Sequence, residues 1–98
     1  MNVSFYATLR QVVGAKAVQF DLPHGATVQQ LVDEMIRCYP GLKHELLNEQ
    51  GQLYQHVHVF VNGRDASFLD QGMDTALAAE DTVGVFPAVG GGRVTSDR

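Results

Sequence analysis

One amphipathic segment, residues 28–39, constrains the fold more than any other part of the chain. Its apolar residues recur at spacings of three and four, which places them in one stripe on a helix. They are Val28, Leu31, Val32, Met35, Ile36 and Tyr39. Thr27 and Gln30 have the spacing of a capping box, and Pro40 and Gly41 supply a stop. The pattern predicts one main helix, followed by a short helical piece over 42–47.

Two strands are expected before this helix. Apolar and polar residues alternate over 3–9, which predicts a half-buried strand that runs through Leu9. After a break at residues 13–15, the alternation returns over 18–22 and stops at the turn residues of 23–25. Because only a short polar link joins the two strands, they indicate a hairpin.

Beyond the helix the sequence predicts two further strands and an irregular crossing. Valines at every second position of 57–61 predict a third strand, which Asn62 and Gly63 end in a tight turn. Residues 65–81 have no sustained period. The apolar residues expected to cover an edge of the core in this crossing are Phe68, Leu69 and Leu77. A last strand is predicted over 83–87.

The order of these elements gives the fold class. The predicted order is strand, strand, helix, strand, crossing and strand. One helix is therefore available to cover one face of one sheet. We therefore expect an α+β fold of the ubiquitin-like β-grasp kind, with a mixed sheet of four to five strands packed on one main helix. With 98 residues, of which 45% are hydrophobic, the chain can bury one modest core. We expect one domain over residues 1–89 and a flexible tail over 90–98.

Charge and cysteine content exclude several classes of protein. The net charge of −4 has the wrong sign for a protein that binds nucleic acid by neutralising phosphates. A single cysteine cannot form an intramolecular disulfide. No apolar run approaches the roughly 20 residues that cross a bilayer, and the N-terminus lacks a signal-peptide pattern. We expect a cytoplasmic protein with no nucleic-acid or membrane partner.

The last expected strand continues into a segment that ends in three glycines, which have no side chains. The segment reads Phe86, Pro87, Ala88, Val89, Gly90, Gly91 and Gly92. Pro87 keeps the residue before it extended. Glycine has no Cβ atom, so the final residues can thread a channel too narrow for any other residue. An enzyme could then reach the backbone carbonyl of Gly92.

This tail resembles the C-terminus of the MoaD/ThiS family of ubiquitin-like sulfur carriers, which ends in a Phe-Pro-Pro-Val-Ala-Gly-Gly type motif. Residues 59–63 resemble the third strand and turn of that family. Residues 74–77 and 80–83 resemble the segments that lead into its last strand. The resemblance covers residues 3–92. The insertion at 40–55 and the Phe-Pro-Ala-Val lead are most similar to molybdopterin synthase small subunits and to a carrier used in cysteine synthesis.

The resemblance implies an acyl carrier that works with partner enzymes and is not an enzyme itself. An E1-like adenylating enzyme would activate the carboxylate of Gly92 with ATP, and sulfur would then replace AMP to leave a thiocarboxylate. Gly91 would thread the channel with Gly92, preceded by Gly90, Val89 and Pro87. A sulfur-accepting enzyme, such as a molybdopterin synthase large subunit, would take the sulfur. The resemblance implies no bound cofactor, and other acceptors stay open: a thiazole precursor, a cysteine precursor or a transfer RNA.

Six residues, Arg93–Arg98, follow Gly92 and depart from the family pattern. While they are present, Gly92 has an amide carbonyl and no free carboxylate. We expect a precursor that a processing peptidase, such as a metal-dependent one, cuts after Gly92. Three alternatives stay open. The chain is a protein modifier joined to lysines through Gly92, or a pure interaction module that keeps Arg98, or its glycines only end the last strand.

Four side chains are candidates for a partner-binding surface. If the valines of the third strand face inward, His58 and Phe60 face outward, beside Tyr6 of the first strand and Phe86 of the last. Clustered aromatic residues on an open sheet face mark surfaces where partners bind. We expect the activating enzyme or the acceptor to dock there. In the alternative, loops or the segment 40–55 fold over this face.

Three weaker patterns favour structural roles. His56 and His58 share a strand face, as two metal ligands would, but no third ligand has matching spacing, so we expect no metal site. Cys38 is expected to be a buried packing thiol. The acidic pairs at 33–34 and 80–81 are expected to be solvated.

Overall fold

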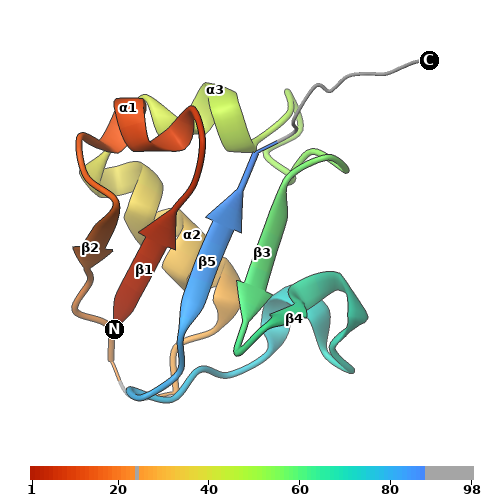
Figure 1. Cartoon of the computed structure of the whole chain (residues 1–98). Helices are drawn as coiled ribbons and strands as arrows, with labels where there is room; N and C mark the ends of the chain where they lie inside the picture. The colour runs from red at the N-terminus through yellow and green to blue at the C-terminus, as the bar shows by residue number, and fades with distance from the viewer. Residues whose placement is uncertain (24, 88–98) are drawn as a thin grey trace.

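The main helix, α2, spans Val28–Cys38 and packs against one face of the sheet (Figure 1). The structure is a computed structural model that describes residues 1–23 and 25–87. The predicted capping box is present, because Gln30 N–H donates to Thr27 Oγ1 at 3.2 Å and Thr27 N–H donates to Gln30 Oε1 at 2.8 Å. The buried side chains of α2 are Val28, Leu31, Val32 and Met35. The predicted amphipathic helix is confirmed.

Five strands form one mixed sheet. They are β1 (Asn2–Phe5), β2 (Ala17–Gln19), β3 (His58–Val61), β4 (Arg64–Asp65) and β5 (Val83–Phe86). Their order is β2-β1-β5-β3-β4, so β5 is the central strand (Figure 1). β1 is parallel to β5, whereas the β1–β2, β3–β5 and β3–β4 pairs are antiparallel. The predicted α+β, ubiquitin-like β-grasp fold is confirmed.

The first strand ends at Phe5, so the prediction that it runs through Leu9 is wrong. Ala7 has a φ of 54°, which interrupts the extended backbone. A short helix, α1 (Leu9–Val13), follows, and its Leu9 is fully buried. Leu9 therefore reaches the core from a helix. β1 and β2 still pair antiparallel, so the predicted hairpin is confirmed with α1 inside its connection.

A second short helix, α3 (Leu42–Leu46), confirms the helical piece expected over 42–47. Its Leu42 and Leu46 are fully buried, and α3 lies beside α1 at the end of the sheet where β5 finishes (Figure 1). The segment 40–55 therefore contributes to the core and to this end of the sheet. Within the described ranges, no helix combines the length and the apolar character needed to cross a membrane.

The crossing between β4 and β5 contains two turns of 3₁₀ helix, η1 (Ala66–Phe68) and η2 (Gly72–Asp74). Leu77 is buried and Leu69 packs against the core, as expected. Phe68 is 79% exposed, so the expectation that it covers the core is wrong. The reason is the tight turn of η1, in which Ala66 takes the inward position at 3% exposure and Phe68 points outward.

Candidate functional site

The tail residues singled out in the sequence follow the central strand. β5 ends at Phe86, which lies opposite His58 of β3, and Pro87 is a buried residue. Val89, Gly90, Gly91 and Gly92 lie outside the described residues. The described start of the tail segment therefore lies at the end of the central strand, where Phe86 is the neighbour of His58.

We call the side chains of Tyr6, Phe60 and Phe86 the aromatic surface. They come from three adjacent strands or their ends, because β5 lies between β1 and β3. The rings of Tyr6 and Phe86 stack, with centroids 4.0 Å apart and planes 6° apart. Phe60 meets Phe86 edge to face at 5.1 Å. All three side chains are half-buried, and the stacked and edge-to-face ring contacts hold them together as one group.

A hollow of 290 Å³ lies within the aromatic surface. Gly84 forms part of it, because a Cβ atom at this position would come within 3.2 Å of Tyr6 Cε2. The hollow is lined by residues of β1, β3, β5 and their turns, and by none from the segment 40–55. The alternative in which that segment covers this hollow is therefore wrong. The guanidinium of Arg10 lies 5.5 Å from the centre of the Tyr6 ring, and Arg10 Nε donates to the Phe5 carbonyl at 2.8 Å.

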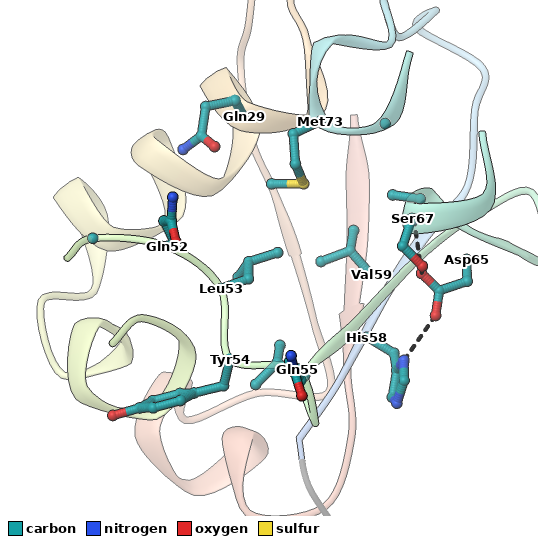
Figure 2. A pocket seen from close by; sticks show the side chains of 14 residues that line it. Gln29, Gln52, Leu53, Tyr54, Gln55, His58, Val59, Asp65, Ser67 and Met73 are labelled. Atoms are coloured by element: carbon teal, nitrogen blue, oxygen red, sulfur yellow. Dashed lines mark hydrogen bonds and ion pairs between the residues drawn. The ribbon is translucent and has the colours of Figure 1, made fainter. Parts of the chain in front are cut away.

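His58 lies at the edge of the aromatic surface and belongs to a chain of hydrogen bonds. Its Nδ1 lies 2.7 Å from Asp65 Oδ2, while Asp65 Oδ1 accepts from the backbone N–H and the hydroxyl of Ser67 (Figure 2). Burial opposes ionisation of Asp65, but the hydrogen bonds from Ser67 and His58 together hold the pKa of Asp65 below its ordinary value. The carboxylate of Asp65 is therefore already occupied by partners within the fold.

Sequence reasoning missed Asp65. The signal was present in the tight turn at Asn62 and Gly63, which fixes the register of β3 and β4 and sets Asp65 opposite Phe60. In an antiparallel pair, residues two positions away on the partner strand are diagonal neighbours. Asp65 is thus within reach of His58, and the contact follows from the hairpin register.

A cavity of 470 Å³ lies on the helix side of β3 and not on the aromatic surface. Figure 2 shows Met73 and Leu53 pointing into it, with Gln29 and Gln52 at its rim. Asp65 and His58 lie at its far wall. Apart from that already satisfied pair, its lining carries no charged side chain. We therefore place the candidate site at the aromatic surface and the adjoining tail.

The two candidate metal ligands do not share a strand face. His56 precedes β3 and stacks on Tyr54, with ring centroids 4.8 Å apart, whereas His58 pairs with Asp65. Within residues 1–23 and 25–87, no group of three or more His, Cys, Asp or Glu residues is placed to hold a metal ion.

Cys38 is exposed, so the expectation of a buried packing thiol is wrong. It is the last residue of α2, and its Sγ lies 3.7 Å from Glu34 Oε2. That carboxylate also pairs with Arg37 at 2.6 Å, and the hydrogen bond from Arg37 lowers the pKa of Glu34. The thiol therefore belongs to a surface cluster of polar groups at the end of the helix.

Asp81 is more than a solvated acid. Its carboxylate accepts from Ala78 N–H at 2.8 Å and from Asn62 Nδ2 at 3.0 Å. These hydrogen bonds hold the pKa of Asp81 below its ordinary value. Asn62 Oδ1 also accepts from Thr82 N–H, so the network ties the β3–β4 turn to the residues that enter β5. Asp81 thus helps to set the start of the strand that leads to the tail.

The comparisons with known proteins agree with this architecture. The model of the ThiS family matches residues 3–92. Small archaeal modifier protein 3 of Haloferax volcanii is 41% identical over 92 residues, which is 94% of this chain and 98% of that protein. The sulfur carrier protein CysO of Mycobacterium tuberculosis is 33% identical over 70 residues, covering 69% of this chain and 74% of that protein. The crystal structure of SAMP1 from Haloferax volcanii superposes with a TM-score of 0.82 at 32% identity, covering 93% of this chain and 97% of that one.

Proposed function

Since this chain belongs to the ThiS family of ubiquitin-like proteins, we propose that it is a sulfur carrier whose Gly92 is activated at its carboxylate. The observation that carries the proposal is the extent of the family match, which runs through the glycines and includes Gly92. A relative that is 33% identical is named a sulfur carrier protein. The proposal makes the chain a carrier that acts with partner enzymes and is not an enzyme itself.

The chemistry begins with hydrolysis of the peptide bond between Gly92 and Arg93, which releases residues 93–98 and leaves a free carboxylate on Gly92. A peptidase supplies this step. An E1-like adenylating enzyme then joins the carboxylate to the α-phosphate of ATP and releases pyrophosphate. A sulfide equivalent displaces AMP from the mixed anhydride, and the product is a thiocarboxylate. The thiocarboxylate is a nucleophile, so a sulfur-accepting enzyme can use it as a mobile form of sulfide.

The geometry supports a specific role for the aromatic surface. The tail begins at the end of β5, beside Phe86, and the hollow at Gly84 lies on the same outer face. An adenylating enzyme that docks Tyr6, Phe60 and Phe86 would hold the tail at a fixed distance from its own active site. Pro87 would keep the first part of the tail extended, and Gly90 and Gly91 would pass through a narrow channel toward the ATP.

The first acceptor that we propose is a molybdopterin precursor held by a larger catalytic subunit. The basis is the lead of the tail, Phe86 to Val89, which resembles that of molybdopterin synthase small subunits. Supplying the thiocarboxylate form to such a subunit should convert the precursor to its dithiolene product. A thiocarboxylate that reacts only with a cysteine, thiazole or transfer RNA precursor would assign the carrier to another pathway.

A second candidate function is protein modification, in which Gly92 forms an isopeptide bond with a lysine of another protein. The observation that favours it is the match to small archaeal modifier protein 3, which covers 94% of this chain. Both functions need the same adenylate of Gly92. They differ only in the nucleophile that attacks the activated carbonyl of Gly92. In the carrier, a sulfide equivalent displaces AMP. In the modifier, a lysine amine attacks the adenylate or a later intermediate formed from it.

The proposal is tested with three versions of the chain, which end at Arg98, Gly92 and Gly91. Each is incubated with ATP and the adenylating enzyme of its own organism, and pyrophosphate exchange is measured. Only the version ending at Gly92 should support exchange, and a sulfur donor should then convert it to a thiocarboxylate. Equal exchange by all three versions, or none by the Gly92 version, would contradict the proposal. The version ending at Gly91 is a control, because it has a free carboxylate that lies one residue closer to the folded domain than the carboxylate of Gly92.

A further inference from the structure

Arg10 is an exposed residue of α1 whose guanidinium is held by two contacts. Its Nε donates to the Phe5 carbonyl at 2.8 Å, and the guanidinium lies 5.5 Å from the centre of the Tyr6 ring. A hydrogen bond and a cation–π contact therefore position the same charged group. Because Tyr6 stacks on Phe86, the last residue of β5, this cation borders the aromatic surface where the tail begins.

The positive charge of Arg10 is not matched by an acid nearby. Residues 1–20 contain no Asp or Glu. The neighbouring helix α3 has Lys43 and Glu45, whose charges offset each other (Figure 1). The ion pairs of the described residues are Arg37–Glu34 and His58–Asp65. The hydrogen bond from the guanidinium to a described residue uses Nε, so Nη1 and Nη2 are available to an acceptor from outside the fold.

The acids of the chain gather in the segment that leads into β5. Residues 65–81 contain no Lys or Arg. Their acids are Asp65, Asp70, Asp74, Glu80 and Asp81. This segment enters β5 at its start, whereas Arg10 lies near its end, where the tail begins. A partner surface with an exposed acid is therefore attracted to the tail end of the sheet and repelled from the opposite end.

We infer that Arg10 binds an Asp or Glu carboxylate of the adenylating enzyme, beside the apolar surface of that enzyme that covers Tyr6 and Phe86. The inference rests on the proposed function, because it names one contact of the same docking step. A planar guanidinium suits the bidentate geometry of a carboxylate. Its single charge also matches a carboxylate, whereas a phosphate group carries about two charges. Arg10 acts in docking and takes no part in the chemistry at Gly92.

The inference is tested with the chain that ends at Gly92, the adenylating enzyme of its organism and ATP. Pyrophosphate exchange is measured at increasing concentrations of the wild type, Arg10→Gln and Lys16→Gln. The last is a matched control, because it removes the same charge from an exposed residue of the same acid-free segment. Arg10→Gln should raise KM by at least about fivefold and leave kcat unchanged, since the lost contact lies away from the reacting atoms. Lys16→Gln should behave like the wild type.

A charge swap then separates an ion pair from a loss of packing around Tyr6. Each Asp and Glu on the docking surface of the enzyme is replaced by Arg in turn. One of these enzyme variants should restore exchange with Arg10→Glu, and it should not improve exchange with Arg10→Gln. Restoration requires a folded chain, so the result does not depend on any change in stability caused by the substitution.

The outcomes distinguish this inference from the proposed function. No exchange with the wild-type chain would refute the proposed function and this inference with it. Exchange by the wild type with an unchanged KM for Arg10→Gln would overturn this inference alone. An equal rise in KM for Lys16→Gln would also overturn it, because long-range attraction would then explain both variants. The same holds if no enzyme variant restores exchange with Arg10→Glu.

Discussion

Gly84→Ala tests the role of the aromatic surface with one added methyl group. Gly84 lies in the middle of the central strand β5, directly under the Tyr6 and Phe86 rings. The new Cβ atom would lie 3.2 Å from Tyr6 Cε2 and 3.4 Å from Phe86 Cε1. The first distance is shorter than an ordinary carbon–carbon contact, so the Tyr6 ring must shift, and the hollow becomes shallower.

The expected change in the free energy of unfolding is small. Replacing glycine by alanine inside a strand contributes about 0.5–1 kcal/mol of stability, because the unfolded chain has less freedom to lose. Disturbing the Tyr6–Phe86 stack costs at most about 0.5–1.5 kcal/mol. Tyr6 is half-buried at the surface and can move, so the two effects nearly cancel, to within about 1 kcal/mol. Docking should suffer more, since overpacking a fitted contact typically costs about 1–3 kcal/mol.

The assay compares unfolding in denaturant with affinity for the adenylating enzyme. Gly84→Ala should unfold close to the wild-type midpoint and bind the enzyme at least about tenfold more weakly, which corresponds to about 1.4 kcal/mol. Gly41→Ala is a matched control, because its Cβ atom would meet Val12 Cγ1 at a similar 3.1 Å, away from the aromatic surface. If a folded Gly84→Ala binds as well as Gly41→Ala and the wild type, the aromatic surface is not the docking site.

Three further predictions concern stability and are all measured by denaturant unfolding. Leu31→Ala removes a fully buried side chain of α2 and should cost about 2–5 kcal/mol, while Thr27→Ala removes the capping box and should cost about 1 kcal/mol. A Leu31 variant as stable as the Thr27 variant would contradict the assigned core. Because hydrogen bonds lower the pKa of Asp81, its carboxylate stabilises the fold above the ordinary carboxyl range, and this contribution is lost as the pH falls through the folded-state pKa. The stability difference between the wild type and Asp81→Asn should therefore be largest near neutral pH and shrink in acid, and a difference that is constant with pH would refute the assignment.

Local signals predicted the elements that depend on local contacts. The capping box and the apolar period of α2 lie within one segment, and both are present in the structure. The sequence did not predict the end of β1. The alternation of apolar and polar residues continues through Leu9 as it would in a strand, although Leu9 is in fact the first residue of α1. Only the positive φ of Ala7, which interrupts the extended backbone, decides between them, and it depends on tertiary packing.

In the candidate site, too, the sequence predicted the features that depend on local patterns and missed those that depend on tertiary packing. Alternation along β3 and β5 was enough to place Phe60 and Phe86 on one outer face, because side chains alternate along every strand. The outward position of Phe68 depends on how a short 3₁₀ turn sits on the core, which no periodic pattern encodes. Cys38 has helical spacing from Met35, but it is the last residue of α2, where it lies exposed beside Glu34.

The intact mass of the chain isolated from its native cell tests the central claim most directly. The account predicts a species that ends at Gly92, and a fraction of it with the mass increase that results when one oxygen is replaced by sulfur. A chain found only with Arg98 at its end would contradict the proposed activation of Gly92. The aromatic surface would then point to a binding role without tail chemistry.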